Sequence, residues 1–225
     1  SGGSRRRMEG KLERKHFLHL SAIDFGLALA AAAYLYFGDR PLVLAVGLAG
    51  ALGGVLYSSP PFSLVSRGVG ELVIFVMFGP LITLGTGYVI EGVFLVDHFL
   101  IGIPMGLLVG NILWINQFPD FDADSRAGKR NLVVRLGLSR ARWGYAILFG
   151  LSLLSVLALA AAGLYPWWSL LFVGLVPLMA KSVKGLWGNY EDPTALTPTQ
   201  ASMIQIQTLA GVVLSVAFLI HVWVG

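Results

Sequence analysis

Long runs of apolar residues alternate with short polar breaks along most of this 225-residue chain. A transmembrane helix needs about 20 mostly apolar residues, with roughly 17 to 25 tolerated. By that measure the pattern predicts seven spans, the second of them short. They lie at residues 17–37, 42–57, 69–90, 99–116, 143–163, 167–187 and 203–224. The predicted fold class is all-α, a polytopic transmembrane helix bundle, and we expect residues 1–225 to form a single domain.

The composition agrees with a membrane protein. Hydrophobic residues make up 56% of the chain and charged residues only 12%, whereas an ordinary soluble domain has roughly 25% charged residues. The chain has no cysteine, which excludes disulfides and thiolate metal sites. Its net charge is +4, but the basic residues are confined to short loops between apolar runs. We therefore expect a lipid bilayer as its environment and no nucleic-acid partner.

The basic residues also predict an orientation, because seven spans divide the loops between two sides. One side carries 15 of the 16 Lys and Arg residues, and the other carries only Arg40. The basic side holds residues 1–16, 58–68, 117–142 and 181–202. Since excess Lys and Arg mark the cytoplasmic face, we expect these segments to face the cytoplasm of a multi-pass protein in the inner or plasma membrane.

The stretch from Asn116 to Gly137 concentrates charge between two apolar runs. Asp120 and Asp124 are four residues apart, so a helix would place both carboxylates on one face and direct Asp122 away from them. Carboxylates this close repel, and some take up protons unless a cation is present. Oxygen ligands without Cys or His favour a hard cation, and Mg2+ is the better candidate because it needs only one or two carboxylates.

Three basic residues of the same stretch, Lys129, Arg130 and Arg135, provide positive charge beside the expected metal site. Carboxylates that hold Mg2+ together with cationic donors suit a diphosphate. An EF-hand is excluded because Ser125 and Asn131 stand where it needs Gly and Glu, and a P-loop is also absent. The alternative left open is a solvated loop whose charges only follow the positive-inside rule.

The stretch from Asn116 to Gly137 resembles the second aspartate motif of the UbiA superfamily of intramembrane prenyltransferases. The family pattern is N-x-x-x-D-x-x-x-D, followed by G-K-x-T-L-x-V-R-L-G. Asn131 stands where Thr is usual. The residues that match in register are Asn116, Asp120, Asp124, Gly128, Lys129, Leu132, Val134, Arg135, Leu136 and Gly137.

Three further segments resemble the branch of this family that prenylates 1,4-dihydroxy-2-naphthoate on the way to menaquinone. They match the patterns Y-T-x-P-P-F, R-G-x-G-E and F-G-P of that branch. In this chain they are Tyr57–Phe62, Arg67–Glu71 and Phe78–Pro80.

The resemblance implies nine transmembrane helices and a first aspartate motif, N-D-x-x-D-x-x-x-D, between the second and third. This chain has neither the first two helices nor that motif. Its first residues resemble the segment that follows the motif, with Arg5 and Gly10 in register. We therefore expect the chain to be the C-terminal seven-helix portion of a nine-helix enzyme, and such a portion alone could be inactive.

The resemblance also implies a mechanism, in which two Mg2+ ions bridge the diphosphate of a polyprenyl donor and an aromatic acceptor attacks the allylic cation. It assigns Asp120 and Asp124 to Mg2+, with Asp122 as an occasional partner and Asn116 as support. The candidates for diphosphate binding are Arg5, Lys129, Arg130 and Arg135.

Near the acceptor, the resemblance places Tyr57 at the reacting centre and gives Arg67 and Glu71 to a lid or to acceptor orientation. The alternatives are an interfacial aromatic for Tyr57 and a helix-start salt bridge for the other two. Other branches have a Lys shortly after the Tyr, and this chain has none there, which leaves the acceptor-side assignment open. The alternative acceptors are 4-hydroxybenzoate, homogentisate, chlorophyllide and a lipid.

Two other classes of membrane protein also use aspartates, and the sequence fits both less well. A transporter would need its aspartates near the bilayer midplane on broken helices, whereas these lie at a loop boundary. A CDP-alcohol phosphotransferase also uses Mg2+ and aspartates, but its longer motif begins with D-G, and Phe118-Pro119 precede Asp120 here.

Overall fold

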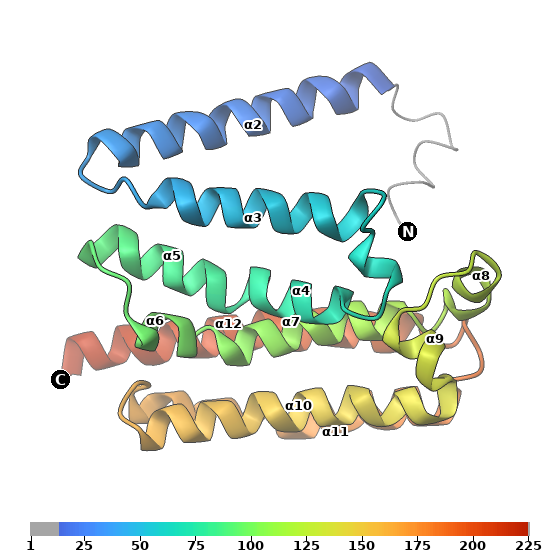
Figure 1. Ribbon diagram of the computed structural model, residues 1–225. Helices are drawn as coiled ribbons and strands as arrows, with labels where there is room; N and C mark the ends of the chain where they lie inside the picture. Colours follow the sequence, from blue (N-terminus) through green and yellow to red (C-terminus); the bar gives the residue numbers. More distant parts are fainter. Residues whose placement is uncertain (1–13, 225) are drawn as a thin grey trace. The chain divides into compact units, whose positions relative to one another are not determined.

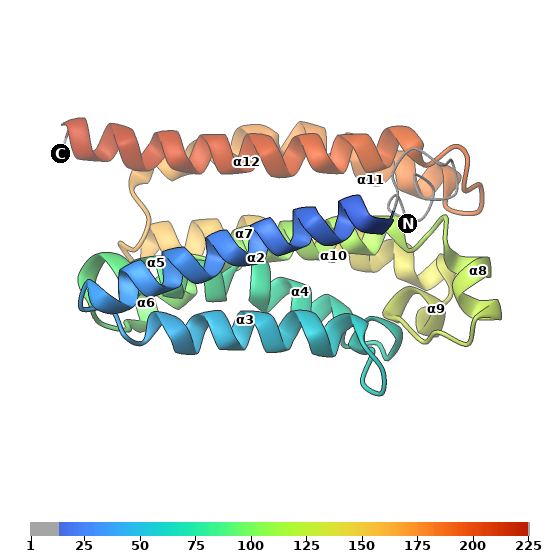
Figure 2. The same cartoon turned by 90° about the horizontal axis from the view of Figure 1, so that it is seen from above.

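The computed structural model describes residues 14–224, and every regular element in that range is a helix. The chain divides into two compact units, Ser1–Leu48 and Ala49–Gly225. The first contains α2 (Arg14–Phe37) and the start of α3 (Val43–Ser58). The second contains the rest of α3 and then η1 (Leu64–Ser66), α4 (Gly70–Phe78), α5 (Pro80–Glu91), α6 (Val96–Leu100), α7 (Ile103–Asn116), α8 (Phe121–Arg126), α9 (Leu132–Leu136), α10 (Leu138–Ala161), η2 (Trp167–Leu175), α11 (Val176–Asn189) and α12 (Thr197–Val224). Within this unit the long helices run side by side along one direction (Figures 1 and 2).

Within the described residues, six helical segments are long and apolar enough to cross a membrane. Helix α3 corresponds to the short second predicted span, and its 16 residues fall below the length of the other six. The prediction of an all-α polytopic bundle is therefore confirmed. The six segments are Lys15–Phe37, Gly70–Glu91, Val96–Asn116, Leu138–Ala161, Trp167–Asn189 and Thr197–Val224.

Two helices begin earlier than the hydropathy pattern predicts. Helix α10 starts at Leu138 instead of residue 143, directly after Gly137, whose φ of 73° turns the chain into the helix. Helix α12 starts at Thr197 instead of residue 203. Pro198 lies in its first turn, where a proline is tolerated because its missing N–H has no intrahelical partner.

Several predicted spans are interrupted where the chain packs most closely. The span Gly70–Glu91 is divided into α4 and α5 at Gly79, beside Pro80. A Cβ added to Gly79 would lie 2.5 Å from the Cα atom of Gly106 on α7 and 2.5 Å from the carbonyl oxygen of Gly102. Only glycine permits this backbone approach, so the break fixes α4 and α5 against α7.

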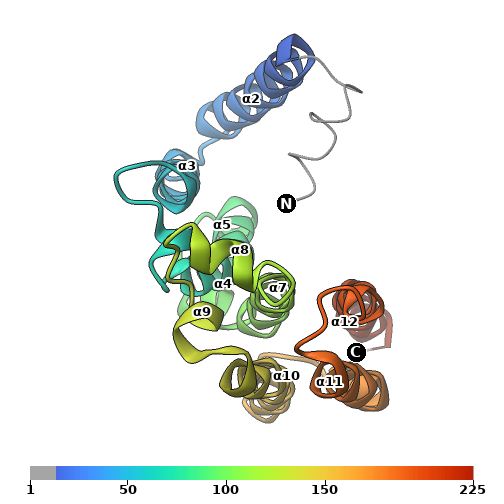
Figure 3. The same ribbon diagram turned by 90° about the vertical axis from the view of Figure 1, so that its right-hand side faces the viewer.

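Helix α7 lies at the centre of the second unit and contacts α4, α10 and α12 (Figure 3). Buried polar bonds join it to α10. The Nδ2 of Asn111 donates to the carbonyl of Tyr145 at 3.1 Å, and the Nε1 of Trp114 donates to the carbonyl of Ala141 at 2.9 Å. The hydroxyl of Tyr145 shares a 2.8 Å bond with Ser182 of α11. Such bonds supplement van der Waals packing where apolar side chains face lipid, and they give the site a rigid base.

Candidate active site

The connection from α3 to α4 carries the first group of predicted site residues. Tyr57 is half-buried in the last turn of α3, and a Cβ on Gly70 would lie 3.3 Å from its ring atom Cε2. The peptide bond between Pro60 and Pro61 is cis. Arg67 follows the short helix η1, and its Nη2 donates to the carbonyl of Pro61 at 2.6 Å. This bond closes the loop back on itself beside the start of α4.

The loop from residue 117 to 137 is bonded directly to that connection. The Nη2 of Arg135 donates to the carbonyl of Arg67 at 2.8 Å, and its Nε donates to the carbonyl of Arg130 at 2.7 Å. The backbone N–H of Arg130 donates to the carbonyl of Ser66 at 2.8 Å. Gly68 has a φ of 76°, and a Cβ there would lie 2.7 Å from the Nε of Arg135. The two motif segments therefore lie side by side.

Glu71 forms a second link between the segments, from inside the protein. Only 7% of its surface is exposed. Its Oε1 accepts from the Nε2 of Gln117 at 2.8 Å and from the backbone N–H of Leu132 at 3.1 Å. Gln117 directly follows α7 and Leu132 begins α9, so one carboxylate oxygen on α4 fixes both ends of the aspartate-bearing loop.

Asp122 and Asp124 lie on the short helix α8, and Asp120 directly precedes it as its N-cap residue. The backbone N–H of Asp124 donates to the carbonyl of Asp120 at 2.8 Å, as expected for residues one α-helical turn apart. The two residues are therefore one helical turn apart along the backbone, as their spacing predicts, and a shared face for their two carboxylates stays a prediction. Asp120 and Asp122 are exposed, whereas Asp124 is nearly buried.

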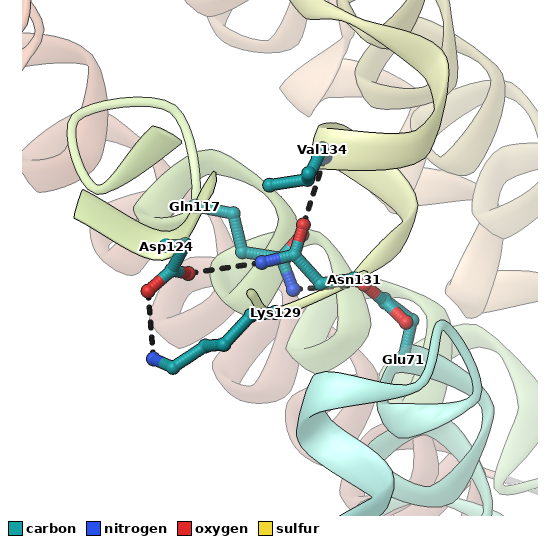
Figure 4. A network of polar contacts seen from close by, with 6 residues as sticks. All are labelled: Glu71, Gln117, Asp124, Lys129, Asn131 and Val134. Atoms are coloured by element: carbon teal, nitrogen blue, oxygen red, sulfur yellow. Dashed lines mark hydrogen bonds and ion pairs between the residues drawn. The ribbon is translucent and has the colours of Figure 1, made fainter. Parts of the chain in front are cut away.

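Both carboxylate oxygens of Asp124 have protein partners (Figure 4). Its Oδ1 lies 2.6 Å from the Nζ of Lys129, and its Oδ2 accepts from the Nδ2 of Asn131 at 2.9 Å. The Oδ1 of Asn131 in turn accepts from the backbone N–H of Val134 at 2.9 Å and caps α9. The charges of the predicted metal ligand and of one predicted diphosphate ligand thus compensate each other.

Comparison with known proteins identifies the family of this site. The sequence profile described as the UbiA prenyltransferase family matches residues 4–203. The chain belongs to this family. It is an integral membrane protein by this membership and by the six apolar helical segments found between residues 14 and 224. Prenyltransferases of the UbiA family are generally divalent-metal dependent.

Individual members of the family are similar to this chain over most of its length. The chain is 30% identical over 196 residues to a 1,4-dihydroxy-2-naphthoate octaprenyltransferase of Haemophilus influenzae, covering 87% of this chain and 63% of that protein. It is 27% identical to the protein of the same name from Bacillus subtilis, covering 93% and 67%. A 2-carboxy-1,4-naphthoquinone phytyltransferase of Synechocystis is 25% identical, covering 73% and 54%. The chain therefore spans about two thirds or less of these relatives. No solved structure matches it significantly.

The remaining predicted residues of this UbiA family chain have different surroundings. Asn116 is exposed, and its Oδ1 accepts from the Nε2 of Gln200 on α12 at 2.8 Å. Arg130 is exposed and uses its backbone, as described, to join the two segments. Arg135 and Arg67 both donate to backbone carbonyls. Arg5 lies outside the described residues.

The chemistry of the donors fits a hard cation, although the described residues do not close a site by themselves. The carboxylate of Asp120 has no hydrogen bond or ion pair to another described residue, and Asp124 follows one helical turn later along the backbone. Among the described residues, no group of three or more His, Cys, Asp or Glu side chains is arranged to hold a metal. Two carboxylates are sufficient protein ligands for Mg2+, which completes its coordination with water and substrate phosphates.

Sequence reasoning missed Gln117, and it noted Asn131 only as a departure from the family pattern. Both are buried, at 5% and 2% exposure. A polar residue directly after the apolar run that becomes α7 was the available signal for Gln117. Its partner Glu71 lies 46 residues earlier, a separation that no local pattern shows.

Proposed function

We propose that the protein containing this chain transfers a polyprenyl group from a polyprenyl diphosphate to 1,4-dihydroxy-2-naphthoate, a step of menaquinone biosynthesis. One observation carries this proposal: the loop with Asp120 and Asp124 is bonded to the segment Tyr57–Glu71 by Arg135 and Glu71. Residues suited to a metal diphosphate and residues suited to an acceptor therefore lie together at one end of the second unit.

The names of the relatives support the acceptor better than the donor. Two are named for octaprenyl transfer to 1,4-dihydroxy-2-naphthoate, and the third is named for phytyl transfer to 2-carboxy-1,4-naphthoquinone. Their acceptors share the naphthalene ring system, whereas their prenyl groups differ. We therefore propose a naphthalene-type acceptor and leave the length of the prenyl chain open.

We propose that the metal is Mg2+ and that Asp120 and Asp124 bind it, with Asp122 as an occasional or water-mediated partner. When bound, Mg2+ supplies positive charge that stabilises the departing diphosphate. Lys129 and Arg130 add cationic donors for the diphosphate oxygens, and Asn116 supports the end of α7. Arg5 remains a proposed diphosphate ligand.

The reaction breaks the bond between the allylic carbon and the diphosphate oxygen, and its electron pair leaves with the diphosphate. An electron-rich ring carbon of the acceptor then forms the new carbon–carbon bond, and the ring regains its aromaticity when that carbon loses its proton or, at the carboxylated position, its carboxylate as CO2. Tyr57 is the proposed aromatic neighbour of the cation, because a ring face stabilises positive charge by about 0.5 to 2 kcal/mol. Arg67 and Glu71 shape the wall behind it.

The distribution of basic residues supports a cytoplasmic location for this end of the protein. We also propose that the whole chain is part of one transmembrane prenyltransferase domain, because the family match runs from residue 4 to residue 203 across both compact units. A transporter remains the rival class, but no observation favours it.

The test is prenyl transfer by protein expressed from its complete reading frame, in detergent or lipid, with Mg2+, a polyprenyl diphosphate and the naphthoate. We expect Asp120→Ala and Asp124→Ala each to reduce transfer at least about 100-fold, as loss of a charge-stabilising group does. Glu191→Ala is the control, because it removes an exposed carboxylate from the connection between α11 and α12. Transfer that survives both loop substitutions would contradict the site, and exclusive use of 4-hydroxybenzoate would contradict the acceptor.

A further inference from the structure

The two oxygens of Asp124 are held by chemically different partners, a charged ammonium on Oδ1 and a neutral amide on Oδ2 (Figure 4). Each carboxylate oxygen has a second lone pair, so a neutral hydrogen-bond donor can stay when a metal ion binds. A positive ammonium group 2.6 Å from Oδ1 instead repels an arriving cation and competes with it for that oxygen. The two partners therefore differ in whether they must leave.

Lys129 is the partner that can leave. Its side chain is 42% exposed, whereas that of Asp124 is 13% exposed. The ammonium lies at the end of a flexible four-carbon stem and is strongly hydrated in water. Its departure moves one charged group into solvent and leaves no buried donor without a partner.

Asn131 cannot leave at a similar cost. The residue is 2% exposed, and its Oδ1 already accepts from the N–H of Val134 in the first turn of α9. The next backbone N–H, that of Leu132, is bonded to the buried carboxylate of Glu71. Rotation of the Asn131 amide away from Asp124 would leave buried polar groups unpaired, which is costly.

We propose that Asn131 is a positioning residue that retains Oδ2 of Asp124, and that Lys129 is an exchangeable counter-ion whose departure frees Oδ1 for a cation. The inference rests on the proposed function, in that Asp124 takes part in binding a metal diphosphate. In this arrangement Lys129 neutralises Asp124 before the metal and diphosphate arrive. It then turns to the diphosphate, so the same charge serves both states.

The experiment measures the Mg2+-dependent rise in melting temperature of the protein from its complete reading frame, with and without inorganic pyrophosphate. Asn131→Ser keeps an oxygen that caps α9, since Ser and Asn cap helices equally well, but its side chain is too short to reach Asp124. We expect its half-saturating Mg2+ concentration to rise about 10- to 100-fold, as for loss of other groups that orient metal ligands. Its melting temperature without Mg2+ should fall, because Oδ2 of Asp124 loses its donor, so the Mg2+-dependent rise is measured from the variant's own metal-free value.

Lys129→Met provides a second test that does not depend on the folding of the first variant, because Lys129 is partly exposed. Without pyrophosphate, removal of the competitor for Oδ1 should lower the half-saturating Mg2+ concentration. With pyrophosphate, loss of the diphosphate contact should offset that gain. An unchanged Mg2+ response in folded Asn131→Ser, or in Lys129→Met without pyrophosphate, would overturn the inference.

These measurements need neither prenyl donor nor acceptor, so they separate the two proposals. Failure of the wild type to prenylate a naphthoate would overturn the proposed function without affecting the Mg2+ response of these variants. A wild-type Mg2+ response that persists in Asp124→Ala would instead show that Asp124 does not receive the ion, and the inference would fail.

Discussion

Replacement of Glu71 tests whether one buried carboxylate holds the aspartate-bearing loop in place. Its Oε1 accepts two bonds, from Gln117 at 2.8 Å and from the Leu132 N–H at 3.1 Å. Glu71→Ala leaves both donors without an acceptor, and each unsatisfied buried group costs about 1 to 3 kcal/mol. The expected destabilisation is therefore about 2 to 6 kcal/mol, and its lower limit corresponds to roughly a 30-fold change in an equilibrium constant.

Glu71→Gln should behave differently, because it keeps one oxygen as an acceptor and replaces the other with a donor. In the native chain, Oε2 of Glu71 and Oε1 of Gln117 are both buried, and neither has a hydrogen-bond partner among the described residues. The amide group of the Glu71→Gln side chain adds N–H donors, and the buried Oε1 of Gln117 is an acceptor without a donor. The neutral oxygen is a weaker acceptor than a carboxylate, so the two effects offset each other. We expect stability within about 1 kcal/mol of the wild type.

The assay combines thermal unfolding in detergent with hydrogen exchange of the peptide that contains Leu132. Glu71→Ala should lower the melting temperature and speed exchange of that amide roughly 30-fold or more. Glu71→Gln should leave both close to the wild type. Glu191→Ala, which removes an exposed glutamate, is the matched control. Equal effects of the Ala and Gln variants, or unchanged exchange at Leu132 in Glu71→Ala, would refute the reasoning.

Two further predictions concern the surrounding loops. Gly68→Ala adds a Cβ 2.7 Å from the Nε of Arg135 at a φ of 76°, so we expect a loss of about 1 to 3 kcal/mol, measured as a lower melting temperature. Gly128→Ala, at a φ of 72° but with no atom within 4 Å of its Cβ, is the control, and an equal loss there would contradict the contact. Bonds from the hydroxyl and backbone of Thr194 and from the backbone of Ala195 lower the pKa of Asp192. Its stabilising contribution is thus present above the unfolded pKa of about 3.9 and lost as pH falls through the lower folded value. The wild type should therefore be more stable than Asp192→Ala at pH 7, the difference should disappear in strong acid, and a pH-independent difference would contradict this cause.

The apolar pattern predicted the helices well and their interruptions poorly. Hydropathy depends on the average composition over a window of residues. In the described part of the chain, six helical segments of sufficient length occur where that average is most apolar. The division between α4 and α5 depends instead on the approach of Gly79 to the backbone of Gly106. That contact joins two segments distant in sequence, and no window includes both. The same limit applies to the early start of α12, since the role of Pro198 depends on which turn of the helix it occupies.

For the site, spacing predicted what one helical turn determines, and tertiary contacts determined the rest. The four-residue separation predicted one helical turn between Asp120 and Asp124, and their backbone bond agrees with it. The sequence could not show that Glu71 points into the protein, because its partners come from the end of α7 and the start of α9. A direct role of Glu71 at the acceptor stays a prediction. Its observed bonds to Gln117 and Leu132 favour a structural role that supports the site.

The departure of this chain from the family pattern at Asn131 was as informative as the matches. The matching residues indicate which chemistry the loop serves, but they do not say how Asp124 is oriented. An Asn side chain has an acceptor and two donors on one rigid amide plane, so it can cap α9 and hold Oδ2 of Asp124 at the same time. A residue that satisfies a helix and a carboxylate together links the fold to the proposed metal ligand. Substitution of Asn131 should therefore affect both cation binding and stability.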